Sequence, residues 1–432
     1  MKIDHNRRWK LFAVAGAAMA LVAGMATTVP DAYAAGTIKA DDDKWISIGM
    51  GTRTSFSMRE DGAASGSQWS NDFAVDNARI YINGKIHKYV GFEFNTECFN
   101  CPRSGQAAGG PTSNTFGSNS GVGVLDIIGK FEITEPVNIW FGRMLVPTER
   151  GELNGPFYHA VFDGFRTPFN QADFSGGFGA GGAGLYGRDN GVTFFGKIHP
   201  GGTHLQYVAG IFSGLKSAAG AGPNQRDSLK YAGRLTWNLL NEEKNPGYYT
   251  SGTYYGTAGD ILAIAVGGEY QNAGAGSFAN QSRFGSVVSD LLFEKVLANN
   301  GGVFTVNAEF KRYWAQDNVA AFTDAGGCFC MFGGTSWTGY ALYMFPQEIG
   351  IGKFQPYARY TGLNSQFGGA REEYELGTNY VIAGHNARIS TYWRTGTIGS
   401  SGATFNNQNL NYAPGSRGQH VDSFTVALQL QY

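Results

Sequence analysis

The sequence predicts an all-β fold, a transmembrane antiparallel β-barrel of about 16 strands with an infolded constriction loop. Three observations predict it. Many segments alternate apolar and polar residues with a period of two, as a strand with two different faces does. The connections between these segments alternate in length. Glycine supplies 64 of 432 residues and aromatic residues reach 14%, a composition typical of many strands and tight turns.

The chain begins with the pattern of a secretory signal. Basic residues precede an apolar run from Leu11 to Met25, and Ala32 and Ala34 place small residues where a signal peptidase cleaves. A membrane anchor is the alternative, but the run is shorter than the roughly 20 residues that a spanning helix needs. We therefore expect residues 1–34 to be a signal peptide. Residues 35–432 would form the barrel domain in the cell outer membrane of a double-membrane bacterium.

The first strand shows the alternation clearly. Between Trp45 and Met58, even positions such as Ile46 and Ile48 are mostly apolar, and odd positions carry mainly Ser, Gly and Arg. Strand-like patterns of roughly 9–14 residues, enough for a tilted strand to cross a bilayer, recur along the chain. They lie at 77–83, 90–97, 125–132, near 140, 195 and 207, at 231–239, near 265 and 293, at 304–311, near 341, 357 and 378, and at 387–394 and 424–432. The segment near 293 has the least clear pattern.

The connections alternate between short turns and long loops, as in outer-membrane barrels with short periplasmic turns. A soluble sandwich, the alternative, would show no such alternation. The short connections are 84–88, 134–138, 199–203, 298–302, 346–353 and 383–385. The long ones are 60–70, 98–120, 147–187, 213–228, 272–289, 312–335, 362–372 and 395–420. One connection, 240–257, is long where a short turn is expected.

Several stretches from Phe73 onward resemble the phosphate-selective porin O and P family. They are "DNARIYINGKIHKYVGFEFNTE", "FGRMLVPTERGELNGPF", "GRDNGVTFFGKI", "YAGRLTWNL" and "LGTNYVIAGHNARISTYW". Their order and spacing carry the resemblance, which covers most of the chain after the signal. It implies a homotrimeric porin of sixteen strands whose third loop folds into the lumen.

Residues 147–187 show no clean strand pattern, and loops of this length are usually functional or disordered. They form either a constriction loop or an external loop, and we expect the former. The charged groups that would narrow the pore are Glu149, Arg150, Glu152, Asp163, Arg166 and Asp173.

The alternation also assigns charges to the lumen. The expected basic groups are Arg53, Arg79, Lys130, Arg143, Lys197, Arg234, Lys311, Arg359, Arg388 and Arg394. The expected acids are Glu93, Glu97, Asp126, Glu132, Asp189, Glu269, Glu309, Glu373 and Glu375. Phosphate selection needs a run of basic donors with few competing carboxylates, and here the two sets nearly balance. The sequence therefore departs from a phosphate channel, and it leaves open whether anions or cations are preferred.

These features predict a porin for passive diffusion of small hydrophilic solutes or ions, with anions among the options. The alternative is a structural or sheath barrel around a surface partner such as a cytochrome. No nucleophile motif such as GxSxG is recognisable, so we expect no enzymatic activity, no cofactor and no metal. The formal net charge of −1 argues against a nucleic-acid partner. The expected partners are outer-membrane lipid and the solutes.

The chain has four cysteines, Cys98, Cys101, Cys328 and Cys330. The first two form a CxxC, but Pro102 follows, so the CxxCH needed for haem attachment is missing. Disulfides suit an exported protein, and we expect at least one in the extracellular loops. Four cysteines allow three connectivities, and the sequence does not choose among them.

Overall fold

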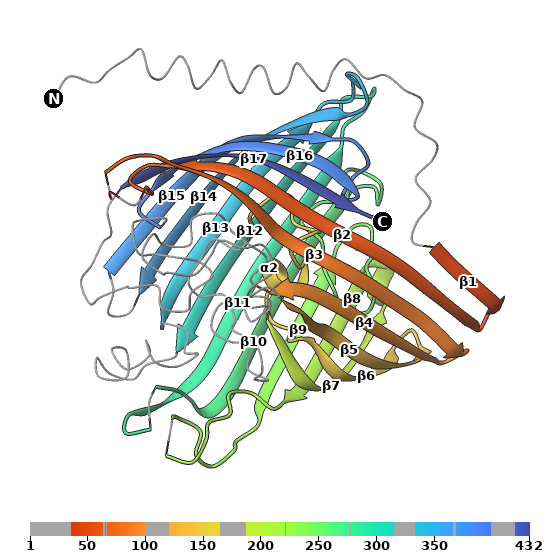
Figure 1. Cartoon of the computed structure of the whole chain (residues 1–432). Coiled ribbons are helices and arrows are strands. Elements are labelled where there is room, and N and C mark those ends of the chain that lie inside the picture. The colour runs from red at the N-terminus through yellow and green to blue at the C-terminus, as the bar shows by residue number, and fades with distance from the viewer. Residues whose placement is uncertain are drawn as a thin grey trace.

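The computed structural model describes residues 36–63, 65, 67–99, 121–164, 187–220, 222–276, 278–314, 333–365, 369–398 and 420–432. The predicted all-β fold is confirmed (Figure 1). The strands are β1 (Gly36–Asp41), β2 (Lys44–Arg59), β3 (Ser70–His87), β4 (Val90–Phe99), β5 (Gly121–Thr134), β6 (Val137–Leu145), β7 (Arg188–Ile198), β8 (His204–Phe212), β9 (Lys230–Asn238), β10 (Ile261–Gly276), β11 (Gln281–Val296), β12 (Val303–Trp314), β13 (Gly334–Met344), β14 (Lys353–Ser365), β15 (Gly369–Val381), β16 (Ala387–Gly396) and β17 (Val421–Gln431). The described helices are two single turns, α2 (Arg150–Leu153) and η2 (Pro200–Gly202).

Sixteen of these strands, β2 to β17, form one closed antiparallel barrel. Each strand pairs with the next in the chain, and β17 closes the ring on β2 from Gly51↔Gln431 to Ser423↔Arg59. Closure leaves no open edge, which is what a β-structure surrounded by lipid requires. β1 forms a hairpin with the start of β2, where Gly36 lies opposite Ile48. Every strand segment expected from the alternation corresponds to one barrel strand.

The prediction of a long loop is wrong for two segments. The segments 272–289 and 362–372 were expected to be long loops, but β10 extends to Gly276, β11 begins at Gln281, and β14 and β15 pair as far as Ser365↔Gly369. Small and polar residues dominate these strand ends, so they lack the apolar face that reveals a strand in lipid. The opposite end of the barrel carries the short turns, the start of β2 and the end of β17. There, the connection between β9 and β10 is long, as the sequence indicated.

The two faces of the barrel differ as the alternation predicts. Apolar side chains such as Met50, Phe141 and Leu376 point outward and are 61–65% exposed, whereas their polar neighbours are buried inside. The outward set forms the surface that a membrane would cover. Among the residues that the structure describes, no helix is long and apolar enough to span a membrane.

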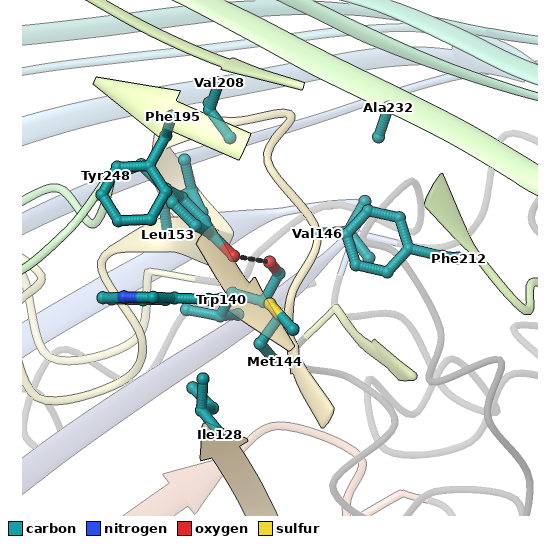
Figure 2. Close-up of a cluster of buried hydrophobic side chains, with 11 residues drawn as sticks. Ile128, Trp140, Met144, Val146, Leu153, Phe195, Val208, Phe212, Ala232 and Tyr248 are labelled. Carbon is teal, nitrogen blue, oxygen red and sulfur yellow. Dashed lines mark hydrogen bonds between the residues drawn. The ribbon is translucent and has the colours of Figure 1, made fainter. Parts of the chain in front are cut away.

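Part of the barrel interior is a packed apolar core (Figure 2). Trp140 of β6 is fully buried, with its ring centre 5.0 Å from that of Phe195 in β7 and 5.3 Å from that of Tyr248. Tyr248 comes from the long connection between β9 and β10, and its hydroxyl donates to the Leu145 carbonyl at 2.7 Å. This side of the lumen is therefore filled by side chains and leaves little room for solutes.

Candidate functional site

Two segments enter the lumen. The first insert, residues 146–164, leaves the end of β6, and α2 lies within the barrel (Figure 1). Its backbone is held by the far wall: Arg388 of β16 donates to the His159 carbonyl at 2.8 Å, and Gln429 of β17 donates to the Phe157 carbonyl at 2.8 Å. These bonds cross from the β6 side to the β16–β17 side, so the insert spans the lumen as predicted for the constriction loop.

The second insert, residues 239–260, enters from the opposite end, the end that carries the short turns. It contacts the first insert directly: the Thr250 hydroxyl donates to the Asn154 side chain at 2.8 Å, and the Gly252 amide donates to the Tyr158 carbonyl at 2.8 Å. Gly247 has a φ of +55°, and a Cβ there would lie 2.2 Å from the Trp140 ring. Glycine is therefore required for the second insert to pack against the wall.

A buried ion network joins the two inserts to each other and to the barrel. Arg150 of the first insert donates to both carboxylate oxygens of Glu243 in the second, at 2.7 and 2.8 Å. It also donates to Asp290 of β11 at 2.9 Å. Arg234 of β9 donates to Asp290 at 2.5 and 2.8 Å and to the Thr148 carbonyl at 2.9 Å. Paired, hydrogen-bonded charges of this kind are costly to separate inside a protein.

Further pairs hold the first insert along its length. Glu149 accepts from Lys311 at 2.6 Å and from the Tyr313 hydroxyl at 3.0 Å, both in β12. Near the other end of the insert, Asp163 lies 3.1 Å from Arg394 of β16. The Arg53 guanidinium of β2 stacks on the Phe162 ring, 3.9 Å from its centre. Contacts with β2, β12 and β16 fix the insert from several directions.

The structure places the predicted constriction residues as follows. Glu149, Arg150 and Glu152 belong to the first insert and are at most 1% exposed, so their side chains face the insert–wall interface. The Asp163 side chain is 34% exposed. Arg166 and Asp173 lie outside the described residues. Within the described part of the loop, the charged groups mainly anchor the insert.

The predicted lumen charges lie on the inner face of the barrel. Nine of the basic groups are buried there, namely Arg53, Arg79, Lys130, Arg143, Arg234, Lys311, Arg359, Arg388 and Arg394. Lys197 is 23% exposed and pairs with Glu242 of the second insert. Further buried charges that the alternation did not indicate lie inside the barrel, namely Arg188, Lys230, Glu243, Asp290, Glu294 and Arg371.

The residue pattern of β11 shows why the buried charges Asp290 and Glu294 were not predicted from the alternation. Its inner face carries Asp290 and Glu294, but also Val288 and Leu292, which are fully buried. Leu292 packs against Tyr254 and Ala258 of the second insert. Because the insert supplies apolar partners inside the barrel, both faces of β11 are partly apolar and the alternation is blurred.

An open cavity remains beside the inserts, with a volume of about 680 Å³. It lies at the short-turn end, between the inner faces of β2 to β5 and the two inserts. Its charged lining residues are Arg79, Lys85, Glu93, Asp126, Lys130, Glu132, Arg188 and Lys244. The cavity is a part of the described lumen that a small solute can occupy.

Most charges at the cavity are paired. Arg79 lies 2.6 Å from Glu97, and Arg188 lies 2.9 Å from Asp126. Lys130 pairs with Glu93, and Lys85 lies 3.8 Å from Glu132. Lys244 of the second insert is exposed, and no ion pair links it to another residue in the described ranges. The lining therefore presents many polar groups and only a small excess of positive charge.

Cys98 lies within β4, near its end, rather than after it. It takes part in a disulfide bond, and the other three cysteines lie outside the described residues. The pairing of the four cysteines stays a prediction.

One group in the described part of the chain could hold a metal ion by distance alone. Potential ligand atoms of Glu60, His420 and Asp422 lie within 4.8 Å of one another at the β2–β17 seam. Glu60 already accepts from the Asp422 amide at 3.1 Å, and His420 lies 2.9 Å from the Thr395 hydroxyl. No further observation points to an ion, so we assign no metal site.

Acidification is expected to loosen the inserts through two histidines. Burial, together with Arg53 and Arg388, lowers the pKa of His159 well below its usual value, and burial lowers the pKa of His385, in the turn after β15, to about 3. The unfolded chain then binds protons first, so stability is full above pH 6.5 and falls below it. Each histidine should lower the free energy of unfolding by about 1 kcal/mol for each pH unit below pH 6.5.

The midpoint of thermal unfolding, followed by circular dichroism between pH 7 and pH 4, checks this prediction. Carboxylates also titrate in this range, so the matched comparison is a double variant, His159→Gln with His385→Gln. Its unfolding midpoint should fall less steeply with pH than that of the original chain. Equal slopes would show that the two histidines do not carry the effect.

Solved structures of porins share this fold at low sequence identity. The anion-selective porin from Comamonas acidovorans matches with a TM-score of 0.55 at 12% identity, covering 90% of this chain and 99% of that chain. OmpF of Salmonella typhi, solved in complex with daunomycin, matches with a TM-score of 0.50 at 14% identity, covering 92% of this chain and 100% of that chain. At these identities the likeness establishes the fold alone, the β-barrel fold of outer-membrane porins.

No family model matches the chain, and no curated protein matches its sequence. Membership of the phosphate-selective porin O and P family therefore stays a prediction.

Proposed function

We propose that this protein is an outer-membrane porin through which small hydrophilic solutes and ions diffuse passively. The observation that carries the proposal is the cavity of about 680 Å³ inside a closed barrel, lined by charged and amide side chains. Charged groups inside a barrel are stable only when they are paired or solvated, which favours a water-filled passage. The fold shared with known porins supports the same function.

The passage follows β2 to β5, because apolar packing and the two inserts occupy the side near β6 to β9. Solute preference is then set by groups on β2 to β5 and at the edges of the inserts, rather than by buried Arg150. Paired charges cancel over short distances, so ion selectivity is weak. Lys244, which has no ion-pair partner among the described residues, tips it toward anions.

Conductance of the full chain in planar bilayers under a KCl gradient tests the function. We expect a water-filled channel with a modest preference for chloride. Lys244→Glu should move the reversal potential toward cation selectivity, because it inverts a charge at the cavity. Lys39→Glu is the matched control, since Lys39 is exposed on β1 and does not line the cavity. Equal shifts for both variants would place Lys244 outside the passage, and absence of current would contradict the porin function.

A sheath around a protein partner is less compatible with this lumen. Such a barrel needs an interior free for its partner, whereas residues 146–164 and 239–260 occupy it. Location in the outer membrane after removal of residues 1–34, and assembly as a homotrimer, belong to the porin proposal. Membrane fractionation, N-terminal sequencing and native mass determination test these points.

A further inference from the structure

We propose that the cavity is a binding site for neutral saccharides on their way through the barrel. This inference rests on the proposed porin function and names the class of solute that the passage favours. It is based on the aromatic rings at the cavity, on its amide groups and on the pairing of its charges.

Besides Phe92 of β4 and Tyr432, which follows β17, four partly exposed aromatic side chains line the cavity, and each of the four comes from a different segment. They are Trp45 of β2, Tyr81 of β3, Tyr158 of the first insert and Tyr249 of the second. Tyr158 is 46% exposed even though it lies within the barrel. Aromatic faces left open to water in a lumen favour a solute that is itself partly apolar. A pyranose ring meets this need, because its C–H faces stack on aromatic rings while its hydroxyl groups remain at the edge.

Two of the four rings, those of Tyr81 and Tyr158, pack against neighbouring rings. The Tyr81 ring meets the buried Phe157 ring edge-on, with centres 6.1 Å apart. The Tyr158 ring lies against His385, with centres 5.2 Å apart. Rings positioned in advance lose little conformational freedom when a solute stacks on them, which favours binding.

The polar lining matches hydroxyl groups rather than ions. Asn83, Asn245 and Asn386 reach the cavity from three separate segments, and an amide both donates and accepts hydrogen bonds, as a sugar hydroxyl does. The pairs Lys130–Glu93 and Arg188–Asp126 add further donors and acceptors with little net charge. A neutral solute can use both members of each pair, whereas an ion is attracted by one and repelled by the other.

The dimensions are also suitable. A volume of about 680 Å³ lies within the range of typical small-molecule sites and accommodates a short oligosaccharide. The cavity opens at the short-turn end of the barrel, so saccharide added on that side should enter most directly.

Block of the ion current by saccharide tests the proposal with the full chain in planar bilayers. Maltotriose should reduce the current with a half-blocking concentration in roughly the millimolar range. Sorbitol has hydroxyl groups but no ring face, so at equal concentration it should reduce the current much less. Trp45→Ala and Tyr158→Ala should each raise the half-blocking concentration about fivefold, because each removes one stacking ring.

Matched variants separate stacking from folding. Tyr158→Phe and Trp45→Phe keep a ring and should retain most of the block. Tyr374→Ala, which removes an outward-facing ring that is 50% exposed, should leave the block unchanged. Equal reduction of current by maltotriose and sorbitol in every variant would reflect viscosity alone and overturn the saccharide site, while the porin function would stand. Absence of any current would overturn the porin function and the site together.

Discussion

Replacing Arg150 with alanine is expected to free the first insert and to raise the single-channel conductance several-fold. The Arg150 side chain is 1% exposed and bonds to Glu243 and Asp290. Its loss leaves Glu243, which is also buried, without this partner, and breaking a buried pair in this way costs about 3–5 kcal/mol. The two inserts then separate, and the passage widens. Conductance of the reconstituted variant, together with protease cleavage between residues 146 and 164, measures the effect.

Two comparisons make this prediction specific. Arg226→Ala removes an exposed arginine outside the barrel interior and should leave conductance and cleavage unchanged. Glu243→Gln added to Arg150→Ala should recover part of the stability, because Asp290 still has Arg234 as a partner. Unchanged conductance and protease resistance in Arg150→Ala would show that the network does not hold the insert in the lumen.

Replacing Trp140 with alanine is expected to destabilise the protein by about 3–5 kcal/mol. The fully buried indole packs against Phe195 of the wall and against Tyr248 and Tyr249 of the second insert. The Lys130 ammonium also lies 4.3 Å from the indole centre. Removing the indole leaves a cavity between the barrel and the second insert, so both should lose stability.

Unfolding by urea in lipid vesicles, followed by far-UV circular dichroism, measures the loss. Trp140→Phe keeps part of the apolar volume and should lose clearly less stability than Trp140→Ala. If the two variants unfold at the same urea concentration, the indole packing is not what stabilises this side of the lumen.

The barrel strands could be predicted from the sequence because lipid and lumen impose opposite requirements on alternate residues. β2 shows this: Met50 faces outward and Arg53 is buried inside. Strand ends beyond the apolar band impose no such requirement, and the long ladder of β10 and β11 was missed there. The infolding of the first insert could be expected from its length and from the family resemblance.

The second insert could not be predicted as part of the site. Its only signal was excess length at the end where short turns are usual. The bond between Arg150 and Glu243 joins residues 93 positions apart, and nothing in local sequence indicates it. Its aromatic residues explain why β11 and the neighbouring wall carry apolar side chains inside the barrel.

The balance of lumen charges could be counted from the sequence, but their pairing depends on strand register. Glu375 lies directly opposite Arg359 on one neighbouring strand and Arg394 on the other. Both arginines bond to this carboxylate, at 2.7 and 2.5 Å. Glu373 also lies 3.8 Å from each arginine. Register therefore turns four separate charges into one fixed group without net charge, which explains how a highly charged lumen can have little net selectivity.

Solutes are expected to pass along β2 to β5, beside the two inserts. Modification of single introduced cysteines by a charged methanethiosulfonate reagent tests this path most directly. Ser47 lines the cavity, whereas Ser390 of β16 is fully buried and bonds to Asn379. Reagent should reduce the current through Ser47→Cys and leave Ser390→Cys and the original chain unchanged. A current that falls in Ser390→Cys but not in Ser47→Cys would contradict passage along β2 to β5.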